Sequence, residues 1–146
     1  MLSDDIRSAT LLGSYDGRDE YQVGRTLVWV CFDSSSSRDE NTAEAFRQLP
    51  SILQAIPDAI ETAVASLRGE SPNFWRLHDL AGTASDLLSV WGIWVYPSTC
   101  HATYHVNENH DFTAPDGAQL PQLDEMHGVY VSRSSDGRMQ SSGGAS

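Results

Sequence analysis

The sequence predicts an α+β domain in which an antiparallel sheet carries helices packed on one face. Strand patterns fill the chain up to residue 32, helical periodicity follows, and strand patterns return from residue 89 onward. With 146 residues, of which 40% are hydrophobic and 20% charged, the chain has the size and composition of one globular domain. We expect residues 1–140 to form this domain and residues 141–146, rich in Ser and Gly, to be a disordered tail.

Strand signals come first. Residues 6–12 have strand character and are followed by a turn signal at residues 15–17. Residues 26–32 are apolar at successive positions, which is typical of a central strand covered on both faces. The polar residues 34–41 are expected to form an exposed, mobile loop.

The helical region is expected to begin near Thr42, whose hydroxyl is suited to capping a first turn. Proline is accepted in a first turn but disrupts a helix interior. We therefore expect a short helix at 42–48 and a longer one that begins near Pro50 or Pro57, with a C-cap at Gly69. A single apolar stripe consists of Leu49, Leu53, Ile56, Ile60, Val64 and Leu67.

The second half of the chain is rich in strand patterns. Residues 71–88 fit either a short helix or a loop, and residues 89–96 form a strand that is apolar on both faces. After a turn at Pro97, residues 100–107 alternate between apolar and polar, which indicates a half-buried antiparallel strand. A further strand is expected at residues 127–133, followed by a turn.

Charge limits the kinds of partner. Nine basic residues, all Arg, stand against twenty acidic ones, so the net charge is −11. This charge argues against a nucleic-acid groove or an anionic membrane surface as the main partner. The chain has no run long enough to span a membrane and no signal-peptide pattern, so the expected location is the cytoplasm. Cys31 and Cys100 lie in apolar segments and are expected to be buried thiols.

The His- and Asp-rich region 101–127 allows an alternative hypothesis, in which the protein is a small metal-dependent or hydrolytic enzyme. His101 and His105 have the spacing of a zinc pair on a helix, but a strand would place them about 13 Å apart. Either one could still join His110 or Asp111 from a neighbouring segment. We favour scattered histidines on a solvated acidic surface, and expect no metal.

No nucleophile elbow, phosphate loop or Cys-x-x-Cys pair is present, so we expect a protein that is not an enzyme and holds no cofactor. An aromatic cluster could line a pocket or an interface, yet strand aromatics more often belong to the core, which we favour. Trp91 and Trp94 are expected on opposite faces of their strand. The cluster comprises Phe74, Trp75, Trp91, Trp94, Tyr96 and Tyr104.

Three segments of the C-terminal half resemble small bacterial immunity-protein-type domains. They are residues 74–80, 92–96 and 127–133, the last followed by Asp136 and Gly137. Domains of this type stand beside toxins in contact-dependent or secreted toxin systems and are typically acidic α+β domains with no catalytic constellation. The resemblance lies in the order of elements and the placement of turns, so it implies a class of function and no site residues.

The resulting hypothesis is a cytoplasmic immunity-type protein that binds and blocks a basic bacterial toxin. Negative charge speeds association with a cationic partner, although it also serves solubility. A homodimeric adaptor joined through an edge strand such as 128–133 is a further alternative. The candidate partner-binding residues are Asp39, Glu40, Glu108, Asp111, Asp116, Asp124 and Glu125.

Overall fold

The computed structural model describes residues 9–32, 37–68, 88–108 and 129–141. Strands and helices alternate in blocks along these segments. In chain order they are β1 (Thr10–Tyr15), β2 (Arg18–Val23), β3 (Thr26–Cys31), α2 (Arg38–Gln54), α3 (Ile56–Arg68), β4 (Leu88–Tyr96), the short 3₁₀ helix η1 (Pro97–Thr99), β5 (His101–Glu108), β6 (Val129–Arg133) and β7 (Met139–Ser141).

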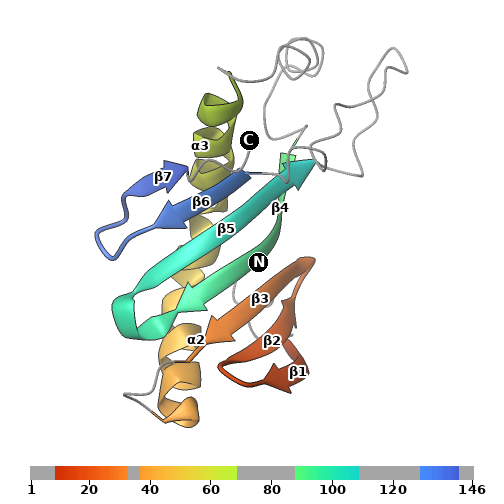
Figure 1. The fold of residues 1–146 in the computed structure, drawn as a ribbon, viewed down its shortest axis with the longest axis vertical. Helices are drawn as coiled ribbons and strands as arrows, with labels where there is room; N and C mark the ends of the chain where they lie inside the picture. The colour runs from red at the N-terminus through yellow and green to blue at the C-terminus, as the bar shows by residue number, and fades with distance from the viewer. Residues whose placement is uncertain (1–8, 33–36, 69–87, 109–128, 142–146) are drawn as a thin grey trace.

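The seven described strands form one sheet in which their spatial order equals their chain order, from β1 to β7. Figure 1 shows α2 and α3 running end to end behind this sheet. The described part of the chain is therefore a mixed α+β fold. No helix in this part of the chain has the length and apolar character needed to cross a membrane.

The sheet is mixed, so the prediction of a purely antiparallel sheet is wrong at one position. β3 and β4 run parallel, with Val28 opposite Ile93 and Val30 opposite Val95, while all other neighbours are antiparallel. A parallel pair needs a long crossover connection, and here α2 and α3 lie between the two strands. The continuous apolar character of both strands is typical of this central position.

Helix α2 begins earlier than expected. Ser37 is its N-cap, and the Ser37 hydroxyl accepts a hydrogen bond of 3.1 Å from the Glu40 backbone N–H. Residues 38–41 are thus helical rather than part of a loop, Asn41 is buried, and Thr42 is not the cap. The signal is a Ser with a Glu three residues later, the capping-box pattern, which places the first turn ahead of Thr42.

The prolines divide the helices differently from the prediction. Pro50 lies inside α2, which continues to Gln54, so a helix that ends at residue 48 is wrong. A proline inside a helix lacks the N–H that would bond the carbonyl four residues earlier. Burial of Leu49, Ile52 and Leu53 outweighs that loss. Pro57 is the second residue of α3, where proline is tolerated, as expected.

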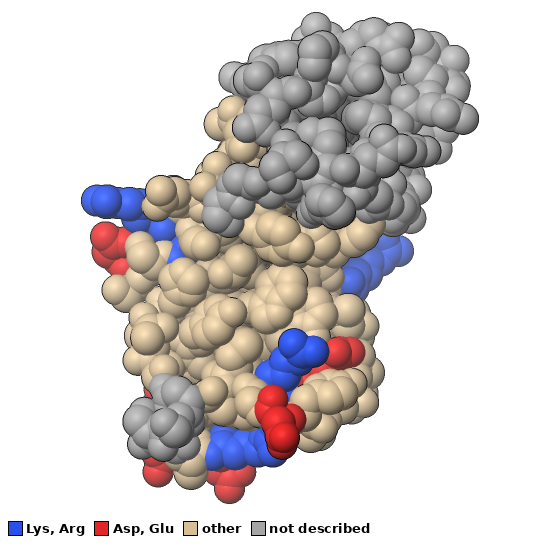
Figure 2. All heavy atoms as spheres, viewed as in Figure 1, with Lys and Arg blue, Asp and Glu red and all other residues tan. Residues whose placement is uncertain are grey.

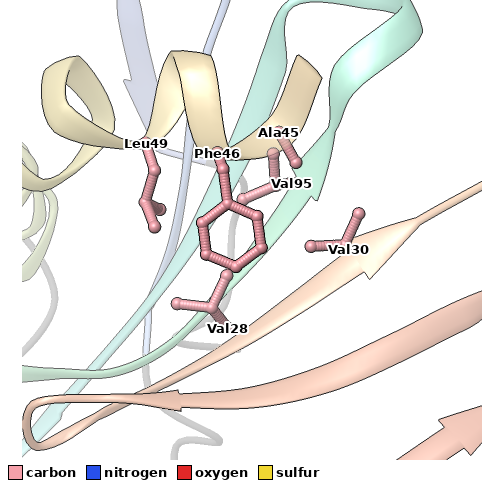
Figure 3. A pocket seen from close by; sticks show the side chains of 6 residues that line it. All are labelled: Val28, Val30, Ala45, Phe46, Leu49 and Val95. Carbon is pink, nitrogen blue, oxygen red and sulfur yellow. The ribbon is translucent and has the colours of Figure 1, made fainter. Parts of the chain in front are cut away.

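The core lies between the helices and one face of the sheet, to which every second strand residue contributes its side chain. Phe46 of α2 lies over Val28 and Val30 of β3 and Val95 of β4 (Figure 3). Of the predicted apolar stripe, four residues are buried and Ile56 is partly buried. The four are Leu49, Leu53, Ile60 and Val64. The side chain of Leu67 and the predicted cap Gly69 lie outside the described residues.

The predicted strands of the second half are confirmed in β4, β5 and β6. Cys100 is exposed rather than buried, because it precedes β5 in a left-handed conformation with φ of 52°. Cys31 is half-buried, and both thiols are free.

The homodimer alternative requires strand 128–133 to be an edge strand, but β6 lies between β5 and β7. Ser141, predicted to open the tail, pairs with Val131 at the end of β7. Residues 71–87, 109–128 and 142–146 lie outside the described residues.

Candidate functional site

A line of aromatic side chains crosses four strands of the sheet. Trp29 of β3, Trp94 of β4, His105 of β5 and Tyr130 of β6 form this aromatic row. Each is half-buried and occupies a strand position that alternates with a core residue, so the row lies on the opposite face from Val28, Val95 and the rest of the core.

Two face-to-face contacts build the aromatic row. Trp29 and Trp94 are register partners, and their ring centroids are 4.5 Å apart at an interplanar angle of 23°. His105 and Tyr130 are also register partners, 4.8 Å apart at 11°. Trp94 lies 6.0 Å from Tyr130, which joins the two pairs. Each of these four rings therefore turns one face toward its register partner.

A β-bulge adds a fifth ring to this face. The register of β4 against β5 shifts between Val90 and Gly92, which makes Trp91 the extra residue. The Trp91 ring then lies 5.7 Å from His105, whereas Trp94 lies 6.3 Å from the same ring. The prediction that Trp91 and Trp94 point to opposite faces is therefore wrong, because the bulge shifts the alternation by one residue.

The aromatic face is only partly covered. Figure 2, viewed from the side of the sheet that faces away from the helices, shows a surface of uncharged residues over the middle of the sheet. Arg, Asp and Glu side chains gather over the lower part of the molecule in this view. One carboxylate lies at the aromatic row, because Glu20 of β2 accepts a 2.8 Å hydrogen bond from Trp29 Nε1.

The core interpretation holds for Tyr104, which is fully buried, but not for Trp91, Trp94 or Tyr96, whose side chains keep solvent contact. Phe74 and Trp75 lie outside the described residues.

A second feature is a hollow of about 350 Å³ between the first half of α2 and the η1 turn. Glu40, Glu44 and Arg47 of α2 line it, opposite Pro97 and Ser98. We call it the acidic hollow because two carboxylates stand there against one guanidinium. Glu44 accepts one hydrogen bond of 3.0 Å from Gln48 Nε2 and pairs with Arg47 at 2.9 Å. Neither ion pair found among the described residues involves the Glu40 carboxylate.

Tyr96 connects the two features. It is the last residue of β4, it is 37% exposed, and its ring lies 5.5 Å from the His101 ring. It lies two residues after Trp94, on the same side of the strand, and directly before Pro97. Burial raises the pKa of the Tyr96 phenol, and its hydrogen-bonded neighbour Cys31 raises it further.

Few of the predicted partner-binding residues are brought together. Asp39 and Glu40 are exposed in the first turn of α2 rather than in a loop. Glu108 ends β5, and its side chain is not described. The remaining four lie outside the described residues: Asp111, Asp116, Asp124 and Glu125. Glu44 is not among the residues predicted from the sequence. Its position four residues after Glu40 predicts that both carboxylates lie on the same face of a helix.

The histidines of the metal alternative have aromatic neighbours. His101 and His105 lie on the same strand, as predicted, and contact Tyr96 and Tyr130 respectively. Within the described ranges no three His, Cys, Asp or Glu side chains are grouped as a metal site would require. His110 and Asp111 lie outside these ranges.

Comparison of the chain with models of known protein families, with curated proteins and with solved structures finds no match.

Proposed function

We propose that this chain is a non-enzymatic binding protein that blocks a basic partner protein in the cytoplasm, the partner being a bacterial toxin of a toxin–immunity system. The observation that carries the proposal is the half-buried aromatic row, which crosses four strands on the sheet face away from the core. The resemblance of the C-terminal half to immunity-type domains supports the class of partner.

The chemistry of the aromatic row favours a protein partner. Trp and Tyr are the residues in which binding energy concentrates at protein interfaces, because they bury much area at little entropic cost. A nucleic-acid base or a sugar would need an exposed ring face to stack on. Trp29 and Trp94 turn their faces toward each other, and so do His105 and Tyr130.

Charge favours a basic partner. The net charge of −11 attracts a cationic surface from a distance and raises the rate of association. The acidic hollow lies next to Tyr96 along the chain, and its volume of about 350 Å³ is large enough for a Lys or Arg side chain beside Glu40. The proposed contact surface thus combines apolar aromatic area with a site for a cation.

The test begins with affinity capture from the source cells at low and at raised salt, with mass spectrometry to identify a basic candidate. Binding of the purified candidate is then measured with Asp39→Lys/Glu40→Lys. The matched control is Asp58→Lys/Glu61→Lys, which makes the same charge change in exposed residues at the start of α3. A third variant, Tyr130→Leu, removes one ring from the aromatic row.

We expect the first variant to slow association about tenfold at low salt, with a smaller effect at high salt. The control pair should change the rate much less, because its charges lie outside the contact surface. Tyr130→Leu should raise the dissociation rate. Equal rates for all variants, or a partner whose binding does not inhibit it, would contradict the proposal.

A further inference from the structure

A second hollow, of about 200 Å³, shares no lining residue with the acidic hollow. It lies where α2 passes the start of β5 and the end of β6. Its lining is mainly polar and includes Gln48, Ser51, Cys100, His101, Arg133 and Ser135. A thiol and two basic side chains therefore line one open cavity of a strongly acidic protein.

The thiol is held at the surface by an unusual backbone. Cys100 has φ of 52° and ψ of 44°, and within the described ranges it is the only residue other than Gly with positive φ. This conformation is costly for a residue that carries a Cβ. Cys100 is exposed, so packing of its side chain does not account for its presence here. Gln48 Nε2 lies 3.5 Å from the Cys100 Sγ, which accepts the hydrogen bond.

Arg133 places a positive charge at this cavity. Neither of the two ion pairs found among the described residues involves Arg133. A guanidinium presents several N–H groups in the plane that a carboxylate requires. Ser51 and Ser135 add hydroxyl donors, so the lining suits a small molecule that carries carboxylates.

We propose that this cavity receives the carboxylate-bearing end of a small disulfide of the class of oxidised glutathione, and that Cys100 is modified there by thiol–disulfide exchange. The Cys100 thiolate attacks one sulfur of the bound disulfide, and a mixed disulfide forms as the original S–S bond breaks. The second half leaves as a thiolate and takes up a proton equivalent to the one that Cys100 lost. The exchange balances without a further oxidant.

Cys31 provides the internal control. It is the second free cysteine, it is half-buried in β3, and it lies on the opposite side of the sheet from the core. Burial raises the pKa of the Cys31 thiol above its ordinary value. A raised pKa lowers the thiolate fraction at neutral pH, so selective modification of Cys100 is expected.

The experiment incubates the reduced, full-length protein with oxidised glutathione and follows the intact mass and the modified peptide over time. We expect one glutathione moiety on Cys100, none on Cys100→Ser, and an unchanged rate for Cys31→Ser. Arg133→Gln should slow the reaction about fivefold or more, while Arg138→Gln, in the same hairpin, should not.

A neutral disulfide, 2-hydroxyethyl disulfide, separates recognition from general reactivity. Arg133→Gln should slow this reaction much less than it slows the reaction with oxidised glutathione, and a variant that has lost its fold would react faster with both reagents. Equal modification of Cys31 and Cys100 would overturn the proposal. So would an Arg133→Gln variant that keeps the full rate with oxidised glutathione.

Discussion

The indole of Trp29 lies directly over Gly92. A Cβ atom placed on Gly92 would be 2.3 Å from Cζ3 and 2.6 Å from Cη2 of that ring. Gly92 follows the β-bulge in β4 and is the register partner of Leu27, two residues before Trp29. Glycine is thus required here for space, since its lack of a side chain leaves room for the edge of the Trp29 ring that stacks on Trp94.

Replacing this glycine should therefore destabilise the fold. We expect Gly92→Ala to lower the free energy of unfolding by about 2 kcal/mol, because the ring must move away from Trp94. The usual gain of Ala over Gly inside a strand is smaller than this. Urea unfolding followed by tryptophan fluorescence measures the effect. Trp29→Leu/Gly92→Ala should lose less than the sum of its single variants, and additive losses would show that the two residues do not compete for space.

The two faces of the sheet differ in how well the sequence predicts them. Alternation along β5 correctly placed Ala102, Tyr104 and Val106 in the core. The bulge at Trp91 has no comparable signal in the sequence, because one extra residue leaves the local composition unchanged. It only changes which sheet face the residues before it occupy, relative to the residues after it. The parallel pairing of β3 with β4 depends on a crossover through two helices. Strand patterns alone do not reveal this pairing, because the two strands are far apart in the chain and are not joined by a turn.

Arg38 ties the start of α2 to the first hairpin. Its guanidinium lies 3.1 Å from the carboxylate of Asp19, which is 5% exposed, and donates a 2.7 Å hydrogen bond to the Tyr15 carbonyl. We expect Arg38→Gln to cost about 2 kcal/mol of stability, because it leaves a buried carboxylate without its cation. Thermal and chemical unfolding both measure this loss.

The exposed pair of Arg47 with Glu44 is the matched comparison. It has a similar N–O distance of 2.9 Å, but both side chains are solvated, so Arg47→Gln should cost less than about 0.5 kcal/mol. In addition, Asp19→Asn/Arg38→Gln should recover part of what Arg38→Gln loses. If the two arginine variants have the same stability, the burial of Asp19 is not what gives the first pair its value.

The N-terminal cap of α2 gives another measurable contribution. The Ser37 hydroxyl accepts from the Glu40 N–H, one of the backbone donors that the first turn leaves without a helical partner. Ser37→Ala should therefore lower stability by about 1 kcal/mol in denaturant unfolding. Ser51→Ala, an exposed change inside the same helix, should be neutral or slightly stabilising. An equal loss in both variants would argue against the cap.

This cap also explains how far the candidate site could be predicted. The loop pattern of residues 34–41 predicts that Asp39 and Glu40 are exposed, which is confirmed. The capping box of Ser37 and Glu40 indicates instead that both lie on a helix, and this helix adds Glu44 one turn later. No sequence signal could pair Trp29 with Trp94 or His105 with Tyr130, since those contacts depend on strand register.

Tyr104 anchors the end of α2 to the sheet. Its hydroxyl donates a 2.7 Å hydrogen bond to the Ile52 carbonyl, one of the last carbonyls of the helix, which lack ordinary helical donors. The side chain has no solvent exposure. We expect Tyr104→Phe to cost about 1 kcal/mol at neutral pH, because the carbonyl remains buried without that donor.

The same residue predicts how stability depends on alkaline pH. Burial raises the pKa of Tyr104 from 10.0 to about 12, with Arg133 acting weakly in the opposite direction. The unfolded phenol therefore loses its proton first, so stability is fully present below pH 10 and decreases as the pH rises toward 12. A shift of this size corresponds to about 3 kcal/mol. Tyr104→Phe should show a shallower loss over this range in urea titrations at a series of pH values. Parallel pH profiles for the variant and the original protein would mean that Tyr104 ionises freely and is not buried as described.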